Sequence, residues 1–238
     1  MELQARKEIE HIRTMTIGMA TLAEEAVHAA IGAFLARDAK KGREVVGKDG
    51  AINALEMEID KAVFECLALK APVASDLRLL FSMQKMNKDL ERIGDHAVNI
   101  AQSAINCSGF GKLIASPDIK VMAAITQCMF SDSVTCFIQA DTQLALKVLE
   151  NDDQVDDLNR AMTREVIDMA QKDITSIETA LELLRVSKNL ERIADLATNI
   201  AEDVIFQAQA RDVKHHHMDA PVQGAGGELT PPPPVSGT

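Results

Sequence analysis

Pairs of carboxylate residues spaced four positions apart are the groups in this sequence best suited to chemistry. Glu91 and Asp95 form one such pair, and Glu191 and Asp195 form another. Residues four apart lie on the same side of an α-helix, so each pair presents two carboxylates in one direction. Carboxylate oxygens are the preferred ligands of hard cations such as Mg²⁺, Mn²⁺, Ca²⁺ and oxidised iron. The spacing therefore indicates cation binding on a helix face.

Further oxygen-bearing residues with the same spacing precede each pair. Asp49 and Asn53 precede the first pair, and Asp152 and Asp156 precede the second. Glu56 and Asp60 extend the first stripe. Like charges at this spacing repel one another on a helix, and facing helices that both carry them would repel further. A bound cation would offset that repulsion.

A solvated charged face is the alternative interpretation, because Lys88 and Arg92 could neutralise the acids as ordinary surface partners. The duplication of the pattern favours a cation-binding site over a solvated face. His96 is replaced by Leu196 at the equivalent position, so we do not expect histidine to be a required ligand. No Ser–His–Asp order, Gly-rich phosphate loop or Cys-x-x-Cys motif occurs, and we expect no enzymatic activity.

The elements that must carry these residues are long helices. The apolar content comes mainly from Ala, Leu, Ile, Val and Met, with no Trp or Tyr, which favours helix over sheet. Before residue 211 only Pro72 and Pro117 interrupt the chain. We expect six helices, near 3–37, 40–69, 73–106, 117–140, 143–172 and 177–210.

The helical part of the chain is an internal repeat. Residues 88–102 match residues 188–202 at ten of fifteen positions, with a constant offset of 100. An earlier block repeats at an offset of 103, which pairs Phe34 with Phe137 and Asp38 with Asp141. The sequence predicts an all-α protein of two tandem three-helix bundles, residues 1–112 and 113–210.

The last segment, residues 211–238, has a different composition. It contains Gly-rich sequence and four prolines from Pro231 to Pro234, so we expect a disordered tail. His215, His216 and His217 could hold a metal weakly, but we interpret them as part of a polar tail, and neither they nor the prolines indicate a role.

Charge and cysteine usage exclude several classes of protein. The 25 Lys and Arg residues against 36 Asp and Glu residues give a net charge of −11, which disfavours nucleic acid as a partner. No apolar run approaches the length of a membrane span, and the first ten residues lack a signal-peptide core. The four cysteines show no paired spacing. We expect a cytoplasmic protein with reduced thiols and no membrane insertion.

The chain resembles the PhoU family, accessory regulators of bacterial phosphate transport. The resemblance covers about residues 1–210. It rests on Asp76-Leu77-Arg78 and on the repeated motif at Leu90–Ala97 and Leu190–Asp195. Each copy of that motif is followed by Asn-Ile-Ala, at Asn99-Ile100-Ala101 and Asn199-Ile200-Ala201. Asp49 with Ile52-Asn53, and Asp152 with Val155-Asp156, also match. The resemblance implies two three-helix bundles related by a pseudo-twofold axis and a protein that forms homodimers.

The resemblance also implies multinuclear metal clusters of iron, zinc, magnesium or manganese. Asp49, Asn53, Glu91 and Asp95 would serve one cluster, and Asp152, Asp156, Glu191 and Asp195 would serve the other. It further implies negative regulation of phosphate-starvation signalling, in which the protein bridges the ATPase of the phosphate ABC transporter and a membrane sensor histidine kinase. Asn53, where an acid would bind better, and Leu196 depart from the family pattern.

Two other functions are compatible with the residues. The chain could be a metal-independent helical interaction module, in which the acids only repel wrong partners. It could also be a metal-dependent phosphohydrolase, because a carboxylate-held metal can activate water. We rank the hydrolase last, since the sequence offers no general base.

Overall fold

Every long segment of the computed structural model is α-helical over the residues that it describes, which are 2–72, 74–109, 116–173 and 177–210. The six predicted helices are present, and the second is divided in two. The bounds are α1 (Glu2–Ala36), α2 (Ala39–Lys48), α3 (Gly50–Lys70), α4 (Ala74–Cys107), α5 (Pro117–Gln139), α6 (Thr142–Lys172) and α7 (Ile177–Gln209).

The division between α2 and α3 falls at Asp49. Gly47 and Gly50 flank it, and glycine weakens a helix because it restricts the backbone least. The second repeat has Glu150 and Asp153 at the equivalent positions, and α6 runs through without a break. The glycines therefore explain why only the first repeat bends next to its predicted metal-binding residues.

Equivalent aspartates begin the second helix of each repeat. Asp38 Oδ1 accepts hydrogen bonds from the backbone N–H groups of Lys40 and Lys41, each at 3.0 Å. Asp141 Oδ1 accepts from Gln143 at 2.9 Å and Leu144 at 3.1 Å. Such caps satisfy N–H groups that have no partner inside the helix. The sequence offset of 103 thus corresponds to the same local structure.

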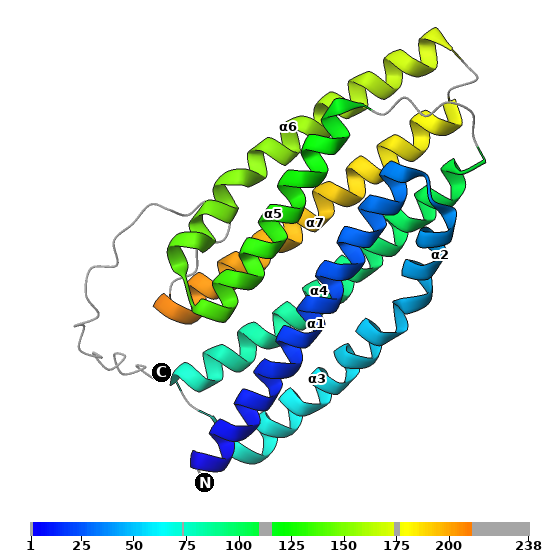
Figure 1. The fold of residues 1–238 in the computed structure, drawn as a ribbon. Helices are drawn as coiled ribbons and strands as arrows, with labels where there is room; N and C mark the ends of the chain where they lie inside the picture. Colours follow the sequence, from blue (N-terminus) through cyan, green and yellow to red (C-terminus); the bar gives the residue numbers. More distant parts are fainter. Residues whose placement is uncertain (1, 73, 110–115, 174–176, 211–238) are drawn as a thin grey trace, which may run out of the picture.

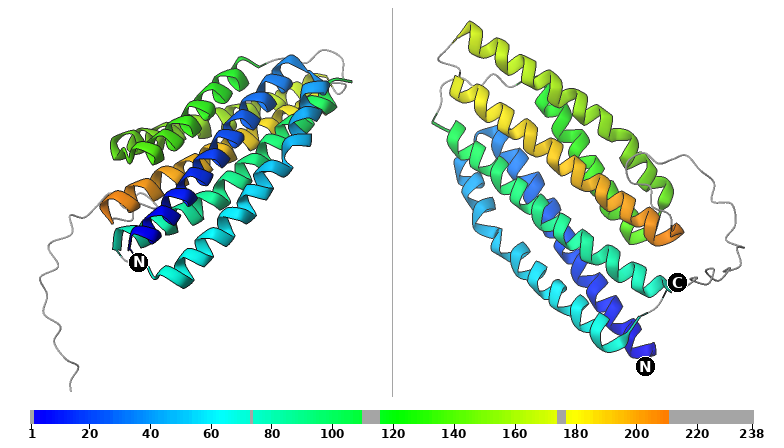
Figure 2. Two further views of the ribbon diagram at one scale, coloured as in Figure 1. Left: turned by 60° about the horizontal axis from the view of Figure 1, so that its bottom comes forward. Right: turned by 180° about the vertical axis from the view of Figure 1, so that it is seen from behind.

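The helices form two three-helix bundles that meet along α4 and α7 (Figure 1). The first bundle contains α1, α2–α3 and α4, and the second contains α5, α6 and α7. Figure 2 shows α4 and α7 side by side between α3 and α6, with α1 and α5 on one side of them. The two central helices are antiparallel, because Ser82 Oγ donates to the Asp203 carbonyl at 3.3 Å and Asn106 donates to Glu182 at 2.9 Å. This arrangement is the expected pseudo-twofold one.

Apolar stripes of the repeat meet in the core. Leu90 and Ile93 of α4 and their counterparts Leu190 and Ile193 of α7 are fully buried.

Two segments, Ala5–Ala36 and Pro117–Gln139, are long and apolar enough to cross a membrane by composition alone. About half of each is buried against the other helices, so their apolar character is that of core helices in a bundle.

Two expectations lie outside the described residues. The tail, with Pro231–Pro234 and His215–His217, falls within 211–238. The predicted boundary between residues 112 and 113 falls within 110–115.

Candidate metal centres

The first cluster of predicted ligands lies where α3 packs against α4. The Asn53 amide donates to Asp49 Oδ2 at 2.9 Å. Asp49 Oδ1 and Asn53 Oδ1 are buried and accept no hydrogen bond. Burial, followed by the charges of Asp95 and Glu56, raises the pKa of Glu91, and Asp49 adds to this effect. The four predicted residues therefore share one poorly neutralised region.

Lys88 neutralises the far end of the same stripe. Its ammonium bonds to Glu56 and, at 2.9 Å, to Asp60 Oδ2. Gln84 and Asn87 donate to Asp60 Oδ1 at 2.7 and 2.8 Å. Burial disfavours the charged form of Asp60, but these hydrogen bonds outweigh it and lower its pKa. Glu56 and Asp60 therefore have a basic partner, whereas Asp49 is bonded to the neutral amide of Asn53.

Gly94 lets α3 approach α4 closely at the first cluster. A Cβ atom at this position would lie 3.0 Å from Ile52 Cδ1 and 3.8 Å from Asp49 Oδ1. The Ile52 side chain would have to shift by a few tenths of an ångström to admit it. The second repeat has Ala194 at the equivalent position, so the two helix pairs differ in packing as well as in ligands.

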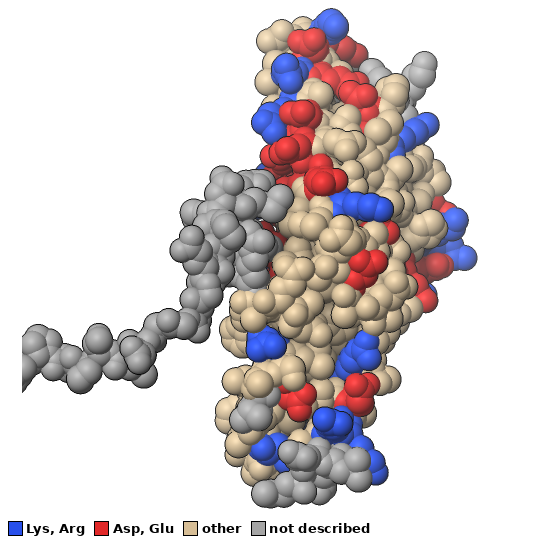
Figure 3. All heavy atoms as spheres, turned by 90° about the vertical axis from the view of Figure 1, so that its left-hand side faces the viewer, with Lys and Arg blue, Asp and Glu red and all other residues tan. Residues whose placement is uncertain are grey.

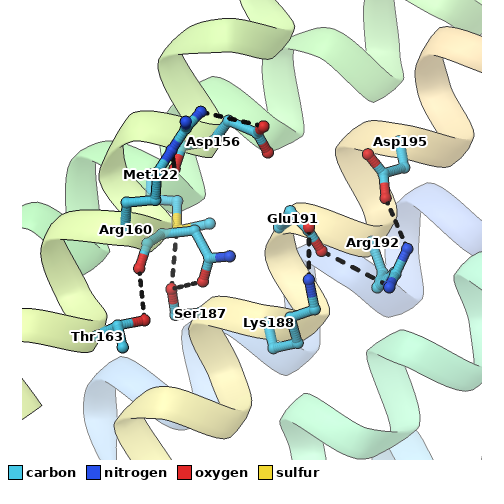
Figure 4. Close-up of polar contacts among 10 residues, drawn as sticks. Met122, Asp156, Arg160, Thr163, Ser187, Lys188, Glu191, Arg192 and Asp195 are labelled. Carbon is cyan, nitrogen blue, oxygen red and sulfur yellow. Dashed lines mark hydrogen bonds and ion pairs between the residues drawn. The ribbon is translucent and has the colours of Figure 1, made fainter.

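The second cluster lies between α6 and α7 (Figure 4). Asp156 of α6 points toward Glu191 and Asp195 of α7. Burial, followed by the charges of Asp195 and Asp156, raises the pKa of Asp152 to about 6. Burial and then Glu191 raise the pKa of Asp195. Two helices therefore bring four acids together, and burial with like-charge repulsion disfavours the ionisation of Asp152 and Asp195.

Basic side chains partly neutralise the second cluster. Lys188 Nζ lies 2.5 Å from Glu191 Oε1, and Arg192 Nη1 lies 3.0 Å from Asp195 Oδ2. Arg160 Nη2 lies 3.2 Å from Asp156 Oδ2. Glu191 Oε2 is buried without a hydrogen bond, and the nearest guanidinium nitrogen, Arg192 Nε, is 3.6 Å away. Figure 3, which views the side where α6 lies, shows acidic side chains gathered in its upper part with basic side chains beside them.

The structure brings the eight predicted residues into two clusters, four in each. As these side chains lie, no three Asp, Glu, His or Cys groups among the described residues are arranged to hold a metal ion. The predicted ligand atoms nevertheless suit a hard cation, because all of them are oxygens. Three of these oxygens are buried without a hydrogen bond. His96 is directed elsewhere, since its Nδ1 contacts Asn189 Oδ1 of α7 at 2.9 Å.

Sequence reasoning missed a cavity beside the first cluster. Its volume is about 820 Å³, and residues of α1, α2, α3 and α4 line it, including Asp49 and Lys48. Gly47 and Gly50 also line it, and a Cβ atom at either would meet nothing within 4 Å. The replacement of these two glycines by Glu150 and Asp153 in the second repeat was the available signal.

Each of the two repeats of this chain matches the same known protein family. The family model described as "PhoU domain" matches the chain twice, over residues 16–104 and 119–204. The chain belongs to the PhoU family. Its first PhoU match contains all four residues of the first cluster, and its second contains all four of the second.

Individual PhoU relatives match over most of their length. A protein from Aquifex aeolicus named "phosphate-specific transport system accessory protein PhoU homolog" is 39% identical over 212 residues, which are 89% of this chain and 96% of the relative. A Pseudomonas putida protein of the same name is 35% identical over 93% of this chain and 88% of its own. The crystal structure of PhoU from Pseudomonas aeruginosa has a TM-score of 0.84 at 33% identity and covers 87% of this chain and 99% of that one. The crystal structure of the phosphate transport system regulatory protein PhoU from Streptococcus pneumoniae has a TM-score of 0.81 at 27% identity. The match covers 88% of this chain and 99% of that one.

Proposed function

We propose that this PhoU-family chain is a cytoplasmic, homodimeric accessory protein that binds metal and represses phosphate-starvation signalling. In this proposal it bridges the ATPase of the phosphate ABC transporter and a membrane sensor histidine kinase. The names of its relatives support a role in phosphate transport, since they are called accessory proteins of the phosphate-specific transport system.

The observation that carries metal binding is the pair of acid clusters with unsatisfied buried oxygens. Asp49 Oδ1, Asn53 Oδ1 and Glu191 Oε2 each lack a hydrogen bond, and a buried polar atom left unpaired costs about 1–3 kcal/mol. Oxygen ligands alone favour a hard cation such as Mg²⁺, Mn²⁺ or oxidised iron over Zn²⁺. We therefore infer that cations occupy both clusters.

A bound cation would supply positive charge between the paired helices. The second cluster also contains Lys188 and Arg192, which come from the same helix as Glu191 and Asp195. Among the described residues, their ion pairs are with acids of α7 itself. Asp152 and Asp156 would hold the cation from α6, so that the metal state would be coupled to the packing of α6 on α7.

Repeat-equivalent apolar side chains support contact with partner proteins. Phe64, Leu77 and Phe81 are exposed in the first repeat, and Ile167, Ile177 and Leu181 are exposed at the equivalent positions of the second. Phe64 is 72% exposed and Phe81 is 52% exposed, which is unusual for such large apolar groups. Exposed apolar patches mark interaction sites, and we assign these two to the transporter ATPase and the sensor kinase.

The regulatory role is tested in a bacterium whose own copy of the gene has been deleted. A phosphate-starvation reporter should be active at high phosphate in the deletion strain and repressed again by the wild-type chain. Phe81→Asp combined with Leu181→Asp should fail to restore repression while the protein accumulates normally, and Val121→Asp, at another exposed apolar position on α5, serves as the control. Full repression by the double variant would contradict the assignment of the patches.

A metal-independent interaction module is the second candidate. It is favoured by the ion pairs from Arg160, Lys188 and Arg192, which already neutralise part of the second cluster. In that case the Glu191→Gln variant would repress the reporter as well as the wild type, and added chelator would not change capture of the transporter ATPase.

A further inference from the structure

A second charged feature lies between the repeats and borders the α6–α7 cluster through Asp195. A cavity of about 270 Å³ opens between α4 and α7. It is lined by Arg92 and His96 of α4 and by Arg192, Asp195, Thr198 and Asn199 of α7, among others. Arg92 and Arg192 are equivalent residues of the two repeats, so the cavity lies where the pseudo-twofold axis brings α4 and α7 together.

The cavity has a positive lining in a negative protein. Two arginines and one carboxylate residue, Asp195, line it, whereas the chain as a whole has a net charge of −11. Guanidinium groups present several N–H donors in a plane and bind carboxylates and phosphates in a bidentate manner. The Asn199 amide adds a neutral group that can donate.

The two arginines differ in their present partners. Arg192 contacts Asp195 at 3.0 Å and Glu191 at 3.6 Å. Arg92 is exposed, and no ion pair with it occurs among the described residues. Arg92 is therefore a guanidinium whose charge is not matched by a contacting carboxylate, and it lines a concave surface with a second one.

We propose that this cavity binds the phosphate group of a small ligand, either inorganic phosphate or a phosphate monoester, between Arg92 and Arg192. At about 270 Å³ the cavity is slightly smaller than the sites of drug-sized ligands, which are typically about 300–1,000 Å³, and it has room for a phosphate group. A tetrahedral dianion can accept hydrogen bonds from both guanidinium groups at once. His96, which is fixed by Asn189 at 2.9 Å, borders the same space.

Binding of the anion would be linked to the neighbouring acid cluster. Asp195 and Glu191 hold Arg192 here, and both are predicted metal ligands. A cation bound by these acids would satisfy their charge and release Arg192 toward the cavity, so cation and phosphate would strengthen each other's binding by the same factor. This linkage, unlike the anion site itself, rests on the proposed function.

Isothermal titration calorimetry on the full chain tests the site with inorganic phosphate and with phenyl phosphate. Arg92→Gln should weaken phosphate binding at least tenfold, because a hydrogen bond to a charged group contributes about 1.5–3 kcal/mol. Arg43→Gln removes an equal charge from an exposed position of α2 and should leave binding unchanged. Binding of both ligands would identify an open site for phosphate groups, and binding of phosphate alone would identify a site for the free ion.

The same titrations separate this site from the proposed metal clusters. Phosphate is titrated with and without Mn²⁺, and Mn²⁺ is titrated into the Arg92→Gln variant. If Mn²⁺ binds normally but phosphate does not bind the wild type, or binds Arg92→Gln equally well, the anion site is refuted and the metal proposal stands. If phosphate binding depends on Arg92 but Mn²⁺ does not bind, the anion site stands and the metal proposal fails.

Discussion

Asp195 on α7 lies close enough to Asp152 on α6 that its charge, added to the effect of burial, raises the pKa of Asp152 to about 6. A carboxyl group with a raised pKa holds its proton more tightly in the folded protein than in the unfolded chain. The ordinary pKa of an aspartate such as Asp152 is 3.8. Without added metal, the free energy of unfolding should therefore be highest below pH 3.8 as far as this group is concerned, and should fall as the pH rises to about 6.

Asp152→Asn should remove that dependence on pH. At pH 7.5 and with chelator present, the variant should be more stable than the wild type by about 1 kcal/mol, because several like-charge contacts disappear. Urea unfolding followed by circular dichroism measures this difference. Asp157→Asn, at an exposed position of the same helix, is the control and should change stability by less than about 0.5 kcal/mol. A less stable Asp152→Asn variant would show that the carboxylate is satisfied by the protein.

Asn53→Asp should strengthen cation binding at the first cluster. The amide of Asn53 supplies one neutral oxygen and donates to Asp49, whereas the equivalent Asp156 supplies a full carboxylate. Calorimetry with Mn²⁺ should show tighter binding for the variant, while its stability in chelator should fall. Gln139→Glu adds the same charge to an exposed position on α5 and should alter neither property. Equal Mn²⁺ affinity in the variant and the wild type would contradict a ligand role for residue 53.

Gly94→Ala tests the close packing of α3 on α4. The added Cβ would meet Ile52 at 3.0 Å, so we expect destabilisation by about 1 kcal/mol and weaker cation binding by the first cluster only. Gly18→Ala is a matched control, since its Cβ would meet nothing within 4 Å. That substitution should stabilise α1 by about 0.5–1 kcal/mol. If Gly94→Ala were equally stabilising, the two helices would not be in the close contact described.

The cysteines should differ sharply in reactivity. Cys128 is exposed, whereas Cys66, Cys107 and Cys136 are buried. Burial raises the pKa of Cys136 to about 12 and that of Cys107 to about 11, so both remain protonated at neutral pH. A thiol reagent should label one residue in the native protein and four after unfolding. Rapid labelling of Cys136 in the native protein would be inconsistent with this core.

The sequence predicted the helices and their duplication because both depend on local patterns. The offset of 103 that pairs Asp38 with Asp141 corresponds to two identical helix caps, and the apolar stripe around Leu90 is the core stripe. The break at Asp49 was not predicted, since Gly47 and Gly50 are tolerated within many helices and only their packing environment decides the outcome.

The pairing of the acids across helices was expected, and Lys88 was recognised as a possible partner for them, but which acids it neutralises was not predicted. Which carboxylates Lys88 reaches depends on the register of α3 against α4, and that register is set by tertiary packing rather than by the sequence around Lys88. For the same reason the sequence did not distinguish Glu56 and Asp60, which the protein neutralises, from Asp49 and Asn53. The cavity between Arg92 and Arg192 exists only because α4 and α7 are antiparallel, which no pattern within one repeat reveals.

Metal content measured by elemental analysis tests the central claim most directly. The purified chain is equilibrated with Mg²⁺, Mn²⁺, iron or zinc and then dialysed. Glu91→Gln with Asp95→Asn should lose the metal of the first repeat, and Glu191→Gln with Asp195→Asn should lose that of the second. The combined variant should retain none while remaining helical, and Asp157→Asn should match the wild type. Unchanged metal content in the combined variant would contradict the account.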